Sequence, residues 1–178
     1  MNPPKIGLPY GIFGPWLSVS QAYGVNVVNT VLFEVPGFSV TINNVLWSLL
    51  GGVAATHAGF GIYAVTPGSL TRGARLADTG PLPTLVANQG VNTSPFLAPV
   101  TLACGIYCMA FTSDSAATTF SGVLSAGENI NILNVYNLTP EGFVGTAANA
   151  AAAGQLPPTL GVITPVGAAK FPVSMLSN

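Results

Sequence analysis

Residues 100–111 read VTLACGIYCMAF, and this stretch decides the fold class of the chain. It is dense in β-branched, aromatic and small apolar residues, and the polar run TSDS at residues 112–115 ends it as a turn would. Successive side chains of a strand point to opposite faces, and here both faces are apolar: Ile106, Cys108 and Ala110 fall on one, Tyr107, Met109 and Phe111 on the other. We therefore expect one strand over residues 100–111 that is buried on both faces, by a second sheet and by a loop or a neighbouring subunit.

Further strand-like segments lie on either side of this stretch. They are short, rich in β-forming residues and separated by Gly, Pro, Asn and Ser: residues 26–38, 39–50, 60–65, 74–79, 82–86, 118–124 and 131–136. Helical periodicity is nearly absent, and the alanine run at 147–153 is short and closed by Gly154, so we expect a turn or linker there. The pattern predicts an all-β fold, a sandwich or a barrel.

Both ends of the chain differ from the middle. Residues 1–25 mix Pro and Gly with large apolar side chains, which opposes an internal strand and predicts an extended arm. Such an arm needs a surface, either its own domain or a neighbouring subunit, and we favour attachment to a neighbour. The expected anchors are Tyr10, Phe13, Trp16 and Leu17. The domain itself is expected over residues 26–145, followed by a Pro/Ala-rich C-terminal extension at residues 146–178.

Charge is scarce in this chain. Charged residues make up 5% of the 178 residues, while hydrophobic residues make up 49%, and an ordinary soluble domain carries roughly 25% charged residues. A weakly charged surface does little to resist association, so a permanent assembly is favoured over a free monomer. Four Lys and Arg against five Asp and Glu cannot form a surface that follows phosphates, so no nucleic-acid partner is expected.

No membrane span or leader is expected either. The longest apolar stretch, residues 45–55, is interrupted by Ser and Gly and is shorter than the roughly 20 residues that a spanning helix needs. The first residues, MNPPK, lack the charged and then apolar pattern of a secretory signal.

The residue types that usually carry catalysis are few and scattered. His57 is the single histidine and lies in the small-residue segment ATHAG, where we expect an exposed loop without a nearby nucleophile. Cys104 and Cys108 share the expected strand, where their Cα atoms would lie ~13 Å apart, too far for a disulfide. One histidine and two such thiols do not make a zinc site. We therefore expect no catalytic residue, no metal and no cofactor.

The carboxylates and two aromatic residues leave alternatives open. Asp78 and Asp114 lie at turns, where their side chains would cap backbone donors, although two carboxylates facing one sugar would indicate a glycan hydrolase. Tyr136 and Phe143 could be exposed and stack on a glycan, although packing within the fold or between subunits explains them as well.

An ordered set of segments resembles a known kind of module. The segments are GIY at residues 61–63, PGSL at 67–70, RLADTG at 75–80, APVTL at 98–102, GIYCMAF at 105–111 and LPPTL at 156–160. Together they resemble the jelly-roll modules of tailed-bacteriophage virion proteins, which include tail fibres, tailspikes and capsid decoration proteins.

This resemblance implies a jelly-roll-like antiparallel β-sandwich and a structural role, not an enzyme. It also implies a homotrimer in a virion assembled in the host cytoplasm, with other capsid or tail proteins as partners. A receptor- or glycan-binding module of a tail fibre, with a host-surface glycan as partner, is the first alternative. A glycan hydrolase is the second.

Overall fold

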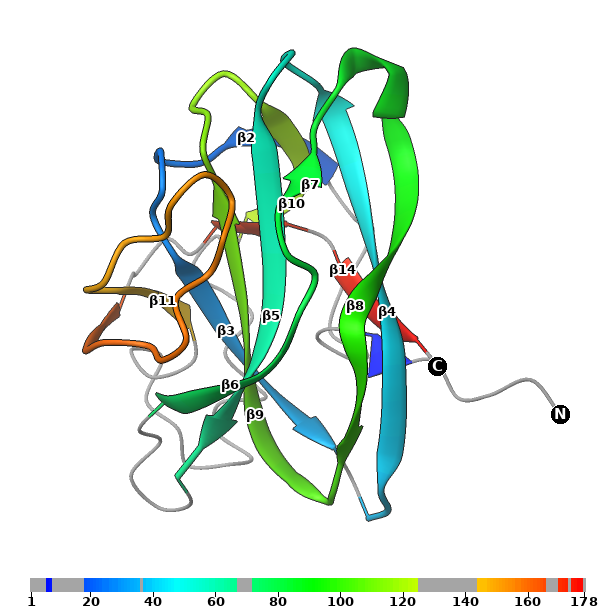
Figure 1. The fold of residues 1–178 in the computed structure, drawn as a ribbon, viewed down its shortest axis with the longest axis vertical. Helices are drawn as coiled ribbons and strands as arrows, with labels where there is room; N and C mark the ends of the chain where they lie inside the picture. The colour runs from blue at the N-terminus through cyan, green and yellow to red at the C-terminus, as the bar shows by residue number, and fades with distance from the viewer. Residues whose placement is uncertain are drawn as a thin grey trace, which may run out of the picture.

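The computed structural model describes residues 6–7, 18–35, 37–66, 72–124, 144–165, 170–172 and 174–177. Within these residues, two seven-stranded antiparallel sheets pack face to face, which confirms the expected all-β sandwich (Figure 1). The described part contains no α-helix, only the single 3-10 turn η1 (Val86–Asn88). No helix there is long and apolar enough to cross a membrane.

Sheet A is built around one long strand. Its members are β1 (Ile6–Gly7), β2 (Ser18–Ala22), β4 (Val40–Gly51), β8 (Gly90–Leu102), β10 (Thr119–Leu124), β13 (Lys170–Pro172) and β14 (Ser174–Ser177). Strand β4 pairs with β8 along nearly its whole length and with β14 and β10 on its other side. The C-terminal strands β13 and β14 therefore join β10 and β4, and the chain end is part of the sheet.

Sheet B has the order β12-β11-β3-β9-β5-β6, with β7 added to β5. Its strands are β3 (Asn29–Val35), β5 (His57–Val65), β6 (Arg72–Asp78), β7 (Leu82–Pro83), β9 (Gly105–Ser113), β11 (Val144–Ala147) and β12 (Ile163–Pro165). Along the chain, β3, β5 and β9 of this sheet alternate with β4, β8 and β10 of sheet A. Most partners in either sheet are thus distant in sequence, and closing such contacts costs chain entropy before packing can offset it.

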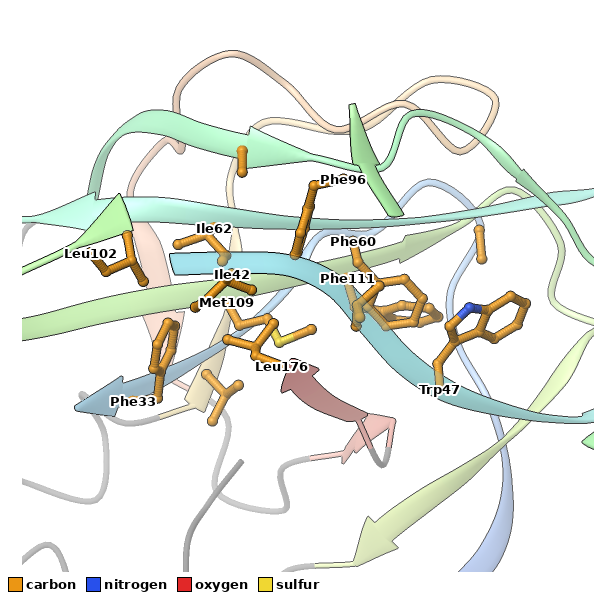
Figure 2. Packing of buried hydrophobic residues seen from close by; sticks show 14 of the residues in the cluster. Phe33, Ile42, Trp47, Phe60, Ile62, Phe96, Leu102, Met109, Phe111 and Leu176 are labelled. Carbon is orange, nitrogen blue, oxygen red and sulfur yellow. The ribbon is translucent and has the colours of Figure 1, made fainter. Parts of the chain in front are cut away.

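The main core lies between the two sheets and is dominated by aromatic rings. Phe111 of β9 sits at its centre, with its ring centroid 4.8 Å from that of Tyr23, 5.0 Å from Phe60 and 4.9 Å from Phe120. Trp47 of β4 lies beside this group, as Figure 2 shows, and its indole N–H is satisfied by the Ser94 hydroxyl at 2.9 Å. Edge-to-face and tilted ring pairs of this kind stabilise a core beyond the area they bury.

A second apolar cluster covers the outer face of sheet B. Cys108 and Ala110 of β9 and Tyr63 of β5 are buried there beneath Leu156 and Leu160. Residues 108–111 are buried on both faces, as expected, while Ile106 and Tyr107 are only partly buried. The cover on the outer face is the chain's own residues 148–161, which we call the cover segment.

The expectation of one strand over residues 100–111 is wrong. The chain leaves sheet A at Leu102, bends at Ala103 and Cys104, and enters sheet B at Gly105. Because the bend consists of small apolar residues, no polar turn signal marks it. The residues of β8 before Val100, which include Pro95 and Pro99, were not among the expected strands. A strand with proline is tolerated at a sheet edge, and β8 pairs with β4 alone among the described strands.

Described residues of both expected end segments, residues 1–25 and 146–178, belong to the sandwich. Within the expected arm, β2 pairs with β10, and Tyr23 is buried in the main core. Within the expected extension at residues 146–178, the cover segment closes sheet B and Leu176 of β14 is fully buried. Proline and glycine prevent long regular strands in these segments. The apolar side chains of the segments can still pack against sheet faces formed by other strands.

The other expected strands have mixed outcomes. Strands β3, β4, β5, β6 and β10 lie where the sequence predicts them, within a few residues, while only two residues of the weak segment 82–86 pair as β7. The alanine run ends β11 and continues into turns, as expected of a turn or linker. The segment 131–136 lies outside the described residues.

Candidate functional site

Three of the segments that carry the family resemblance meet on the outer face of sheet B. They are residues 61–63 on β5, residues 75–80 at the end of β6, and residues 156–158 of the cover segment. The Tyr63 hydroxyl donates a 2.6 Å hydrogen bond to the carbonyl of Pro157. The backbone N–H of Arg75 donates to the carbonyl of Pro158 at 2.8 Å. Two strands thus hold the two prolines through their carbonyl oxygens, which proline retains although it lacks an N–H.

A partly buried ion pair completes this arrangement. Arg75 Nη1 lies 2.6 Å from Asp78 Oδ2, and the side chains are 25% and 6% exposed. Asp78 Oδ2 also accepts a hydrogen bond from the Gln155 side-chain amide at 3.2 Å, and Arg75 donates to the carbonyl of Leu156. The carboxylate therefore binds side chains, and the expectation that Asp78 caps backbone donors is wrong. We call Tyr63, Arg75, Asp78 and Gln155 the latch, because they fasten the cover segment to sheet B.

Two glycines allow the cover segment to approach β5 closely. A Cβ atom at Gly61 would lie 2.8 Å from Leu156 Cδ1, and one at Gly59 would lie 2.1 Å from the carbonyl oxygen of Gly154. The contact at Gly59 is with backbone, so only glycine leaves room for the segment there, whereas at Gly61 the end of the Leu156 side chain would have to move aside. The glycine of the GIY motif thus lies in close contact with the cover segment. Burial raises the pKa of Tyr63 well above its usual range, so its hydroxyl stays a donor to that segment.

The single histidine is not the free loop residue that the sequence predicts. His57 is the first residue of β5, and its side chain is 38% exposed. Asp114, directly after β9, accepts the backbone N–H of His57 at 2.7 Å and faces its ring Nδ1 at 3.0 Å. The expected capping role of Asp114 is therefore confirmed. The same carboxylate orients the imidazole, which links the start of β5 to the end of β9.

This pair resembles two members of a hydrolytic triad, but the third is not present among the described residues. A triad needs a hydroxyl or thiol within hydrogen-bond reach of His57 Nε2, and no described residue makes that bond. The neighbouring hydroxyls bond to one another: Thr56 Oγ1 lies 2.6 Å from Thr84 Oγ1 and 3.2 Å from Thr118 Oγ1. The pair and this network join β5, β7 and β10 at one end of the sandwich.

The two cysteines lie in different surroundings. Cys104 is exposed in the bend between β8 and β9, whereas Cys108 is fully buried under the cover segment, and both are free thiols. Among the described residues, no three His, Cys, Asp or Glu side chains lie close enough together to hold a metal ion. Burial raises the pKa of the Cys108 thiol to about 11.

Selective thiol labelling follows from this difference. At pH 8 we expect iodoacetamide to modify Cys104 in the folded protein and to leave Cys108 unmodified. The attacking species is the thiolate, which at a pKa of about 11 is roughly one Cys108 thiol in a thousand at pH 8. Mass spectrometry should find one modified site in native protein and two after denaturation in urea. Equal labelling of both sites in the native state would contradict the buried position of Cys108.

Charge is distributed unevenly between the sheets. Strands β1, β2, β4, β8, β10 and β14 of sheet A contain no Asp, Glu, Lys, Arg or His. The only charged residue in any strand of this sheet is Lys170 of β13. The other charged residues and the histidine of the described part lie in sheet B or directly after it: Glu34, His57, Arg72, Arg75, Asp78 and Asp114. The sequence contains this signal, but it becomes visible only when strands are assigned to sheets.

The remaining candidate residues lie outside the described part of the chain. These are the expected anchors Tyr10, Phe13, Trp16 and Leu17 and the expected glycan contacts Tyr136 and Phe143. Their roles stay predictions.

Comparisons with protein-family models, with curated proteins and with solved structures each found no match to this chain.

Proposed function

We propose that this chain is a structural subunit of a bacteriophage particle, a small jelly-roll-like module that is attached to the capsid or tail. The observation that carries the proposal is the latch. Segments that together resemble virion modules also contact one another in the folded chain. At this contact Tyr63, Arg75 and Asp78 fasten the cover segment. A set of residues that works as one structural unit is a stronger basis for a resemblance than the same residues scattered over the fold.

The composition supports an assembling subunit. With 5% charged residues and an uncharged strand set in sheet A, the molecule has little electrostatic resistance to permanent contacts. The resemblance implies three copies in the assembly, in a virion built in the host cytoplasm. In this role the sandwich is a structural unit, and its function is to make contacts with neighbouring proteins of the particle.

Residues 1–17 serve as the attachment arm in this proposal, with Tyr10, Phe13, Trp16 and Leu17 as anchors. Burial of apolar surface is favourable by about 25 cal/mol of free energy per Å². Docking of the apolar arm in a groove or at a sheet edge of a neighbouring virion protein would therefore stabilise the contact. The arm ends at residue 17 because β2 and Tyr23 belong to the sandwich. Within it, the two residues of β1 pair with β14 at the edge of sheet A.

Deletion of residues 1–17 tests the proposal. We expect the shortened protein to remain folded, with a melting temperature within about 5 °C of the full chain, because β2 and Tyr23 are retained and the only described strand lost is the two-residue edge strand β1. In cells that produce the particle, incorporation measured by quantitative mass spectrometry of purified particles should fall at least tenfold.

The matched control is the full chain with Phe38→Ser, which changes an exposed aromatic residue of the sandwich and should leave incorporation unchanged. Normal incorporation of the shortened protein would reject the arm. Absence of the full chain from purified particles would reject the virion role itself.

A further inference from the structure

The outward face of β4 and β8 consists of uncharged residues. Cross-strand neighbours there are Thr41 and Thr101, Leu46 and Thr93, and Ser48 and Val91. We call these six residues the ribbon face. The alternate residues of β4, among them Ile42, Val45 and Trp47, are buried in the main core, so the opposite side chains point away from the sandwich. Figure 1 shows the two strands side by side along one flank of the molecule.

This face contains no charge but many groups that both donate and accept hydrogen bonds. A Thr or Ser hydroxyl is a donor and an acceptor at once, whereas Lys and Arg only donate and ionised Asp and Glu only accept. Thr41 and Thr101 already demonstrate the pairing of like groups, since their hydroxyl oxygens lie 2.9 Å apart. Val91 adds an apolar side chain that is 78% exposed.

These properties fit a second copy of the chain better than an unrelated partner. Around a symmetry axis, each side chain near the axis meets the same side chain of another copy. A charged group would then face its own charge, while a hydroxyl or an aliphatic group can pair with itself. Sheet B places charged residues on its strands β3 and β6, namely Glu34, Arg72, Arg75 and Asp78, whereas β4 and β8 carry none.

The outward surface of sheet A around β4 approaches the size of such a contact. The 12 residues of β4 extend over about 40 Å, so the two strands of the ribbon face cover roughly 400 Å², and β10 and β14 on the other side of β4 raise this to roughly 600 Å² before side-chain relief is counted. A stable interface buries about 800 Å² on each partner. Pairing of the β8 edge with another β8 edge is disfavoured, because Pro95 and Pro99 lack the N–H groups that such a ladder uses.

We propose that the ribbon face packs against the same face of other copies of the chain around a symmetry axis and that this contact holds the subunits together. The inference rests on the proposed function in one respect, since it names the surface through which the assembling subunit contacts its own kind.

The test uses charge of either sign on the full-length chain. One variant carries Thr93→Lys and Thr101→Lys, and the other carries Thr93→Glu and Thr101→Glu. Light scattering of the wild type at micromolar concentration should give a multiple of the 18.0 kDa chain mass. Each variant alone should have its dissociation constant raised at least ~100-fold, because every contact then brings like charges together. Mixing the two variants in equal amounts should restore assembly.

The matched control carries Thr159→Lys and Thr164→Lys, two exposed threonines on the sheet B side, and should assemble as the wild type does. A monomeric wild type, charged variants that still assemble, or monomeric variants that mixing does not restore would each overturn the inference. Misfolding cannot imitate the supporting result, because unfolded variants would not be rescued by mixing. A chain that assembles through this face but is absent from particles would overturn the virion role and leave the ribbon-face contact standing.

Discussion

Replacing Phe111 with alanine is expected to lower the free energy of unfolding by about 4 kcal/mol. The ring is fully buried between the sheets, and its centroid lies within 5.0 Å of those of Tyr23, Phe60 and Phe120. Its removal deletes apolar contacts on every side and leaves a cavity that two hydrogen-bonded sheets cannot close. Because a domain is stable by only about 5–15 kcal/mol, the change removes a large share of the total.

Urea unfolding measured by circular dichroism checks this result. The midpoint concentration should fall while the slope of the free energy against urea stays the same, which identifies a loss of stability with an unchanged fold. Phe38→Ala is the control, since Phe38 is 57% exposed and its loss should cost no more than about 0.5 kcal/mol. A Phe111→Ala protein as stable as the Phe38→Ala protein would show that the aromatic cluster is not the centre of the core.

Replacing Asp78 with alanine is expected to cost about 3 kcal/mol of unfolding free energy. The substitution leaves the Arg75 guanidinium, 25% exposed, without its carboxylate, and it takes an acceptor from the Gln155 amide. A buried pair is costly to break from one side because the remaining charge has lost both its partner and part of its hydration. The cover segment should loosen first, since the latch holds it.

A double-mutant cycle separates the pair from its surroundings. If Arg75→Ala is added to Asp78→Ala, the double variant should be less destabilised than the sum of the two single variants, by about 1–3 kcal/mol. Glu34→Ala provides the control, because Glu34 is a partly exposed carboxylate on β3. In the Asp78→Ala protein, the backbone amides of Arg75 and Leu160 should exchange hydrogen faster than in the wild type. The Arg75 amide donates to Pro158 of the cover segment, and the Leu160 amide of the cover segment donates to Gly73. Additive effects, or a cost no larger than that of Glu34→Ala, would show that the Arg75–Asp78 pair does not help to hold the segment.

The two proposals assign different surfaces to different tasks. Under these proposals residues 1–17 would attach the subunit to the particle, and the ribbon face would join copies of the subunit. The latch does neither, and its task is to keep sheet B covered so that Cys108 and Tyr63 stay buried. The uncharged strands β4 and β8 would then face other copies of the chain.

Sequence alone determined the fold class and the alternation of β9. Strand residues repeat with a period of two, and turns are marked by Gly, Pro, Asn and Ser, so local physics was enough to predict β3, β4, β5, β6 and β10. The two apolar faces of residues 106–111 likewise required burial on both sides. The segments of the resemblance could be read in order, but their meeting in the latch could not.

Tertiary structure decided which faces meet and which segments belong to the sandwich. Residues 148–161 and 170–177 look like a tail in sequence because Pro157, Pro158 and their neighbours cannot form regular local structure. The cover segment, for example, is held by partners about 80–95 residues away, such as Arg75 for Leu156 and Tyr63 for Pro157. The same holds for the His57–Asp114 pair, separated by 57 residues. Contacts of such separation are set by the packing of whole sheets, and no local pattern records them.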